Sequence, residues 1–214
     1  MTEYDSRSQA DNVFAERVPY PQGGLARRLA SSPIFLWRLG FGPLVGRNFL
    51  ILTHIGRHTG RVRRTALEYH VLDGQIYVFN AWPQSDWFHN VQAEPRVTVQ
   101  THQGPMSALA HVLESTEEYA QAFRLVERSP LLRVLLESAG IEVSLSGFLS
   151  EKERFQIVSF EPTDLQTPPG LRADLRWFMP AALVLFGLGF IFGNQLRTQR
   201  SKPRGFWERL KGSF

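Results

Sequence analysis

The chain has 214 residues, of which 43% are hydrophobic and 21% are charged, a balance typical of a folded globular domain rather than a disordered or fibrous chain. It contains no cysteine, which excludes a disulfide scaffold, a thiolate metal site and a cysteine nucleophile. The formal net charge is +4, but residues 195–214 hold six Lys and Arg against one Glu, so the remainder of the chain is nearly neutral. A basic tail on a neutral domain argues against a nucleic-acid partner.

The first segments of the chain differ sharply in composition. Residues 1–22 are polar with little periodicity, so we expect a flexible N-terminal arm; early acidic residues and the lack of an apolar run argue against a signal peptide. From Leu25 to Val45 apolar and aromatic residues alternate with arginines, which predicts a short amphipathic helix broken near Gly40–Pro43. We expect this helix to cap the following domain; the alternative is that it lies on a lipid surface.

Residues 23–165 carry the pattern of one strand-rich domain. Short apolar or alternating runs predict strands over 49–53, 65–72, 76–79, 96–101, 106–113 and 155–160. Helices are predicted over 86–93, from a capping box at Ser115 to Arg128, and from Pro130 to about Gly140. Five or six strands joined mostly by hairpins, with only a few helices, predict a mainly β, α+β fold: a small antiparallel β-barrel.

The C-terminal part has a different character. Pro and Gly predict a linker over 166–174, followed by an apolar helix over 175–196 and a basic tail over 197–214. The twenty residues from Trp177 to Leu196 carry no charge and would span roughly 30 Å as a helix. We therefore expect attachment to membrane lipid through residues 175–214, with the barrel in the cytoplasm; a span and a dip into one leaflet both stay open, and a buried core helix is the alternative.

One turn concentrates the groups that bind anions. Between two predicted strands, Gly56 and Gly60 allow a tight backbone turn, Thr59 adds a hydroxyl, and four arginines fall within eight residues, at positions 57, 61, 63 and 64. Guanidinium groups bind phosphate and carboxylate oxygens through paired hydrogen bonds, so this turn predicts an anion cradle; the alternative is a solvated charged loop. The histidines lack metal-ligand spacing, and no metal site is expected.

Two tryptophans stand at the next strand–helix corner. Trp82 and Trp87 are either core residues or an aromatic wall for a planar ring, and the spacing fits both.

The chain contains three motifs in this order: Leu52-Thr53-x-x-Gly56-Arg57-x-Thr59-Gly60-x-x-Arg63, Asp73-Gly74-x-x-Tyr77-Val78, and Trp87-Phe88-x-Asn90-x-x-Ala93-x-Pro95-x-Val97-x-Val99. In this order, from about Phe49 to Leu113, the chain resembles the deazaflavin (F420)-dependent nitroreductase family of flavin-type split β-barrels.

The resemblance implies a split barrel in which reduced coenzyme F420 gives a hydride to a small apolar acceptor, quinone-like or nitro. It implies a phosphate-contacting turn and a ring-side segment, with candidate cofactor-binding residues Thr53, Gly56, Arg57, His58, Thr59, Arg63, Ala81, Trp82 and Trp87. Alternatives are FMN in the same barrel and a non-enzymatic, membrane-tethered cofactor or lipid carrier; a homodimer stays open. The proton for the product could come from His89, Tyr69 or water.

Overall fold

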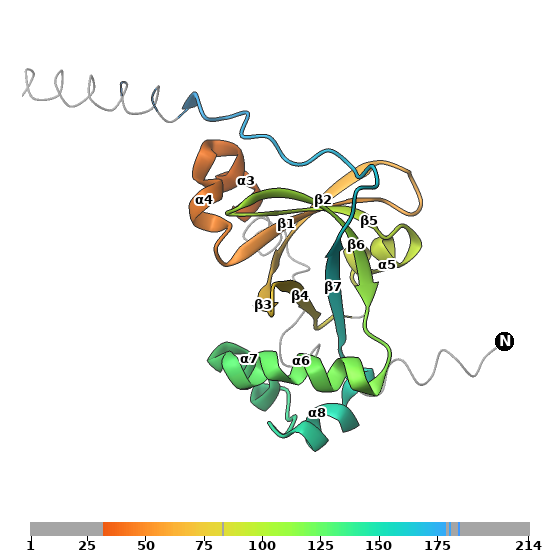
Figure 1. The fold of residues 1–214 in the computed structure, drawn as a ribbon. Coiled ribbons are helices and arrows are strands. Elements are labelled where there is room, and N and C mark those ends of the chain that lie inside the picture. Colours follow the sequence, from red (N-terminus) through yellow and green to blue (C-terminus); the bar gives the residue numbers. More distant parts are fainter. Residues whose placement is uncertain (1–31, 83, 179, 181–183, 185–214) are drawn as a thin grey trace, which may run out of the picture. The chain divides into compact units, whose positions relative to one another are not determined.

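The computed structural model describes residues 32–82, 84–178, 180 and 184, and the chain divides into two compact units, Met1–Ala173 and Asp174–Phe214. The predicted arm over 1–22, most of the apolar helix over 175–196 and the basic tail over 197–214 lie outside the described residues. Within the described part of the chain, no helix is both long and apolar enough to cross a bilayer. The first unit contains one curved sheet with helices around it (Figure 1).

The sheet has seven strands in the order β2-β1-β5-β6-β7-β4-β3, and every paired neighbour is antiparallel. The strands are β1 (Phe49–Ile55), β2 (Val62–Glu68), β3 (His70–Leu72), β4 (Gln75–Asn80), β5 (Arg96–Thr101), β6 (Gly104–Val112) and β7 (Gln156–Pro162). Because β2 and β3 end the sheet, the curved ladder stays open between them. The fold is mainly β with helices, as predicted, and the opening makes the barrel a split one.

One predicted strand is wrong in an informative way. The run over 65–72 was expected to be continuous, but the structure divides it at Tyr69 into β2, which pairs with β1, and β3, which pairs with β4. At the break the Tyr69 hydroxyl donates to the carbonyl of Gly46 at 2.9 Å. The chain thus changes strand partner at Tyr69 and crosses the opening of the barrel.

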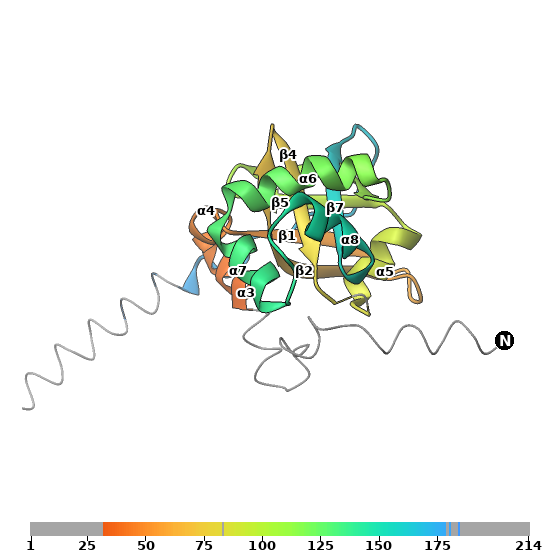
Figure 2. The same cartoon turned by 90° about the horizontal axis from the view of Figure 1, so that it is seen from below.

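Three helices cover one end of the sheet, as Figures 1 and 2 show: α6 (Thr116–Arg128), α7 (Pro130–Ser138) and α8 (Leu145–Ser150). The predicted capping box at the start of α6 is present, with Ser115 and Glu118 each accepting from the other's backbone. Buried aromatic side chains join these helices to the sheet: Tyr119, Phe123, Phe148 and Phe155. The short α8 and the single turn Lys152–Arg154 (η2) were not predicted.

The predicted helix α5 (Asp86–Ala93) forms as expected and packs on β1. Its inner side buries Trp87, Phe88 and Val91 in a second apolar core with Leu50, Leu52, Leu67, Val97 and Val99. In an antiparallel pair, directly opposite residues share a face. The β1–β2 register therefore puts Arg63 on the same face as His54 and puts Thr65 on the same face as Leu52.

The amphipathic segment before β1 is broken where predicted. It forms α3 (Ser32–Leu36), a turn of π-helix (η1, Trp37–Phe41) and α4 (Gly42–Val45), with the kink at Gly40, whose φ of +97° suits glycine. Trp37 is buried beneath the kink, and a side chain on Gly42 would collide with it at 2.8 Å. Leu36 and Leu44 remain exposed beside β2.

The expected linker is bound to the outer face of the sheet along most of its length. Residues 163–171, which we call the strap, are held by side chains of β5 and β6. Thr98 and Ser107 both bond the hydroxyl of Thr167, and the Gln100 amide donates to the carbonyl of Leu171 at 3.0 Å and accepts from its N–H. The strap therefore covers the face of the sheet opposite to the one that carries His54.

Candidate active site

The loop between β1 and β2 closes on itself. The Gly56 amide donates to the carbonyl of Arg61 at 2.9 Å, and the amides of Thr59 and Gly60 both donate to the carbonyl of Gly56. Gly60 has a φ of +63°, in the left-handed region that glycine adopts without strain. A side chain on Gly56 would meet the Thr59 hydroxyl at 3.1 Å. The predicted roles of the two glycines in a tight turn are thus consistent with the geometry.

Helix α5 anchors this loop. The backbone N–H of Arg57 donates to Oδ1 of Asn90 at 2.9 Å, and the Arg57 guanidinium donates to the same oxygen at 3.1 Å. The guanidinium also pairs with the Asp86 carboxylate at 3.0 Å. The Arg57 guanidinium is thus engaged by Asp86 and Asn90, and these contacts attach the loop to α5.

The four arginines of the loop region point to different places. Arg57 is paired with α5, and Arg64 reaches the strap, where it donates to the carbonyl of Pro169 at 3.3 Å. Arg61 is exposed at the end of the loop. Arg63 lies on the inner face beside His54 and, within the described ranges, has neither an ion-pair nor a hydrogen-bond partner. Arg63 is therefore the guanidinium best placed to meet an anion.

A buried histidine lies under the loop. The His54 ring is 2% exposed, with Nδ1 3.2 Å from the amide nitrogen of Asn90 and Nε2 3.3 Å from the hydroxyl of Thr65. Burial lowers the pKa of His54 to about 4; a backbone hydrogen bond at Ile55 raises it in part, and the charge of Arg63 lowers it further. The ring is consequently neutral at pH 7.

These groups surround a polar pocket of about 330 Å³. It is lined by His54, Gly56, Arg57, His58, Thr59, Arg63, Arg64, Thr65, Asp86, Trp87 and Asn90. Arginine, hydroxyl and amide groups dominate this lining, so the pocket has the chemistry of a phosphate or carboxylate site. Six of the predicted site residues line this pocket: Gly56, Arg57, His58, Thr59, Arg63 and Trp87.

A second cavity, also of about 330 Å³, lies in the opening of the barrel. It is lined by Phe49, Ala66, Leu67, Glu68, His70, Val78, Phe79, Asn80, Ala81, Trp82, Leu132, Leu135, Leu136 and Phe155. Apart from Glu68, His70 and Asn80, this lining is almost entirely apolar, and it brings together Ala81 and Trp82 but not Trp87. Trp87 packs edge-on against Phe88 in the core, 6.0 Å between ring centres, and touches the polar pocket instead.

The two pockets follow one another along β2. Arg63, Arg64 and Thr65 line the polar pocket, and the next three residues of the strand line the apolar cavity. The two linings adjoin at Thr65 and Ala66. Successive side chains of a strand face opposite sides, so Leu67 shares the face of Arg63 and Thr65, whereas Ala66 and Glu68 share the face of Thr53.

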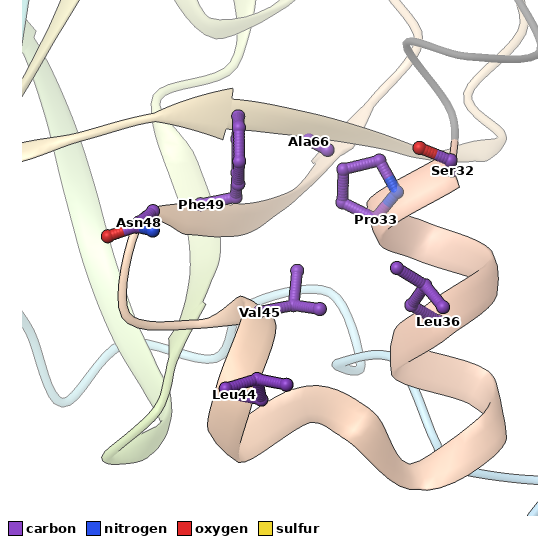
Figure 3. A pocket seen from close by; sticks show the side chains of 8 residues that line it. All are labelled: Ser32, Pro33, Leu36, Leu44, Val45, Asn48, Phe49 and Ala66. Atoms are coloured by element: carbon purple, nitrogen blue, oxygen red, sulfur yellow. The ribbon is translucent and has the colours of Figure 1, made fainter.

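A third hollow, a groove of about 580 Å³, opens between α3, α4 and the start of β1 (Figure 3). Pro33 and Leu36 enter it from α3, and Leu44 and Val45 enter it from α4, as the close view shows. Phe49 and Ala66 line both this groove and the apolar cavity. These two strand residues thus connect the interior cavity to the apolar groove.

The titratable side chains that line the cavity are not the two, His89 and Tyr69, that were considered as proton sources from the sequence. Tyr69 is bound to Gly46, and His89 faces Gln92 on α5 at 3.3 Å; neither lines the polar pocket, the cavity or the groove. Glu68 and His70 line the cavity instead. Burial raises the pKa of Glu68 and lowers the pKa of His70, so each favours its neutral form more than it would in water.

One candidate lies apart from the site. Thr53 is fully buried on the strap side of β1, opposite the face that carries His54, and does not line the polar pocket. Its hydroxyl has no hydrogen-bond partner within the described residues. The sequence reasoning also missed His54, Thr65 and Asn90. Alternation along β2 could have found Thr65, two residues after Arg63, whereas the contact of Asn90 depends on the packing of α5.

In the described part of the chain, no three His, Asp or Glu side chains are placed to hold a metal ion. The polar pocket offers guanidinium, hydroxyl and amide donors, and the neighbouring cavity is largely apolar. Residues 40–131 match the family model described as F420H(2)-dependent quinone reductase. Over these residues the chain is similar to that family, and the match supports an F420-dependent oxidoreductase with coenzyme F420 as its cofactor. The predicted resemblance to a deazaflavin-dependent family is thereby confirmed.

Solved structures resemble the chain at low identity. An F420-H2 dependent reductase (FDR-A) is 20% identical over 54% of this chain and 95% of its own, with a TM-score of 0.40. A structure described as a domain-swapped dimer is 19% identical over 54% and 81%, with a TM-score of 0.40. HutZ, a heme storage protein from Vibrio cholerae, is 14% identical over 68% and 98%, with a TM-score of 0.41. No curated protein matches the chain.

Proposed function

We propose that this chain transfers a hydride from reduced F420 to a small apolar acceptor of the quinone type. The observation that carries the proposal is the division of β2, whose first half lines a cationic pocket and whose second half lines an apolar cavity. The cofactor has the same division, since it joins a phosphate and an acidic tail to a flat ring. When bound, it supplies the hydride chemistry, and the protein supplies position and electrostatics.

The polar pocket would hold the phosphate. Arg63 offers the guanidinium, Thr59 offers a hydroxyl, and His58 stands at the exposed rim of the loop. The loop that presents them is fixed by its own backbone hydrogen bonds and by the attachment of Arg57 to Asn90. A fixed set of donors loses little conformational entropy when an anion binds, which favours tight binding.

The apolar cavity would hold the ring. Ala81 and Trp82, which follow β4, lie on one side, and Leu132, Leu135 and Leu136 of α7 lie on another. The corner after β4 is held by Ser85, which donates to the side chain of Asn80 at 3.0 Å. These contacts would orient the ring and exclude water from it, which protects a hydride donor from side reactions.

The acceptor would reach the ring from the groove. Because Phe49 and Ala66 line both the groove and the cavity, an acceptor lying between α3 and α4 meets mostly apolar side chains, with Ser32 and Asn48 as the polar residues of the groove. This lining favours a quinone over a charged acceptor, because a charged group would lose its hydration there. Glu68 and His70 are the titratable side chains among the cavity residues, and we assign proton delivery to Glu68, because burial raises the pKa of its carboxyl and so favours the protonated acid.

The test combines binding and turnover. The full chain is titrated with F420 and with FMN, and the protein loaded with reduced F420 is mixed with a soluble quinone without air. We expect saturable F420 binding, weaker FMN binding and oxidation of the cofactor that accelerates with quinone. Val45→Phe, in the groove lining but outside the cavity lining, should slow the quinone reaction while F420 still binds, and Ala110→Ser on β6, outside both linings, is the control. Absence of F420 binding would contradict the proposal.

We also propose that residues 175–214 attach the protein to membrane lipid, with the barrel in the cytoplasm. The support is the sequence: an uncharged run from Trp177 to Leu196 followed by a basic tail. The full chain should sediment with vesicles that contain anionic lipid. Replacing the arginines of the tail by glutamine should weaken that binding, and equal sedimentation without vesicles would argue against attachment.

A further inference from the structure

We propose that the Thr65 hydroxyl is a phosphate-binding donor, and that Asn90 and His54 position its proton by fixing the tautomer of the His54 ring. This inference deepens the proposed function, because it assumes that the anion in the polar pocket is the F420 phosphate. Thr65 is not among the candidate residues of the sequence motifs. It lies two residues beyond Arg63 on β2, on the same face, and lines the polar pocket.

The first step is the orientation of the Asn90 amide. Its Oδ1 atom accepts from the backbone N–H of Arg57 at 2.9 Å and from the Arg57 guanidinium at 3.1 Å. Both of these groups are donors without acceptor capacity, so the atom that faces them must be the amide oxygen. The other end of the amide, which faces His54, is consequently the NH₂ donor.

The second step is the tautomer of His54. The NH₂ group of Asn90 lies 3.2 Å from Nδ1 of His54, so Nδ1 must accept and carries no proton. The ring is neutral at pH 7 because burial disfavours its charged form. A neutral imidazole with a bare Nδ1 carries its proton on Nε2, and Nε2 lies 3.3 Å from the Thr65 hydroxyl oxygen.

The third step is the direction of the Thr65 proton. Since Nε2–H of His54 donates to the hydroxyl oxygen, the hydroxyl proton cannot be given back to the ring and is directed elsewhere. Within the described residues, Thr65 has no other hydrogen-bond partner. The remaining direction is the polar pocket, beside Arg63. Thr65 thus presents a single, pre-oriented donor next to an unpaired guanidinium, which is the combination that a phosphate oxygen accepts.

Two variants of Thr65 test the donor. Thr65→Val keeps the shape of the side chain but removes the hydroxyl, and it should weaken F420 binding by at least about tenfold, as expected for a hydrogen bond to a charged group. Thr65→Ser restores the hydroxyl and should bind within about threefold of the wild type. The inference would be overturned if Thr65→Val bound F420 as tightly as the wild type, or if a correctly folded Thr65→Ser variant bound F420 no better than Thr65→Val.

The tautomer of the His54 ring is tested separately, by NMR. Nitrogen-15 NMR of the imidazole in the free protein at pH 7 should show a protonated Nε2 and an unprotonated Nδ1. Asn90→Asp presents an acceptor to Nδ1 and should move the proton there, while Gln92→Glu, on the same helix, should leave the tautomer unchanged. A wild-type ring protonated on Nδ1 would contradict the positioning role.

The two failures can be told apart. If the wild type does not bind F420, the proposed function fails. The inference is then tested by the NMR measurement of the His54 tautomer and by a titration with inorganic phosphate. Phosphate should shift the amide signals of the loop in the wild type and should bind more weakly to Thr65→Val. If F420 binds but the valine variant binds it equally well, the function stands and the role of Thr65 is wrong.

Discussion

Arg57 and Asn90 are joined twice, by the backbone N–H and by the guanidinium of Arg57, although 33 residues separate them in the chain. Asn90 is nearly buried, and its other end meets His54. A single amide therefore links the loop, the helix and the buried ring. The anion pocket is held by this link as much as by the hairpin itself.

Removing the amide should destabilise the protein. Asn90→Leu leaves the Arg57 N–H and a ring nitrogen of His54 without their partner, and we expect unfolding in urea to lose about 1–3 kcal/mol. Gln92→Leu, on the exposed side of the same helix, should change the unfolding free energy by less than about 0.5 kcal/mol. Similar losses in both variants would contradict the role of Asn90.

The arginines of β2 provide a matched pair for ligand binding. Arg63→Ala should weaken F420 binding by about 1.5–3 kcal/mol, because this unpaired guanidinium faces the polar pocket. Arg64→Ala should have a much smaller effect, since its guanidinium reaches the strap at Pro169. Equilibrium titration measures both, and equal losses would show that net charge rather than position holds the anion.

The buried histidine makes stability depend on pH. The folded pKa of His54 is about 4, below its ordinary value of 6.5, so between these values the unfolded chain binds more protons than the folded one. The unfolding free energy should therefore fall as the pH is lowered from 7 to 5. His54→Gln should flatten this dependence, and His58→Gln, at an exposed loop position, should not. An unchanged slope in His54→Gln would contradict a buried neutral ring.

Proton delivery from the cavity can be separated from cofactor binding. Glu68 lines the apolar cavity at the end of β2, and burial raises the pKa of its carboxyl. Glu68→Gln should keep the shape of the lining and F420 bound but slow the reduction of quinone, with the loss shrinking at higher pH, where the wild-type carboxyl has also lost its proton. Stopped-flow oxidation of the reduced cofactor measures this rate, and a wild-type pH profile in the variant would exclude Glu68.

Much of the fold was predictable because its signals are local. Period-two runs, the Asp73-Gly74 turn and the Ser115 capping box each act within a few residues, and the structure contains all of them. Tyr69 shows the limit: the run of β-forming residues continues through it, whereas in the structure the strand partner changes there and the Tyr69 hydroxyl bonds Gly46, in another part of the chain. Alternation alone does not reveal such a break.

The site was predictable in composition but not in arrangement. The glycines and arginines of the loop indicated an anion pocket, yet the sequence does not show that Arg57 faces Asp86 and Arg64 faces the strap. Those directions follow from the packing of α5 and of residues 163–171, which lie far away in the chain. The cavity leucines come from α7 for the same reason, and no pattern near Trp82 indicates them.

The central claim is that one strand, β2, carries both ends of the cofactor, and backbone NMR tests it most directly. Nitrogen-15-labelled protein is titrated with F420 and the amide signals of residues 62–68 are followed. We predict large shifts at Arg63 and Thr65 and equally at Leu67 and Glu68, with the α3–α4 segment responding only when an apolar quinone is added. Shifts confined to the groove residues, with the whole of β2 unmoved, would contradict the account.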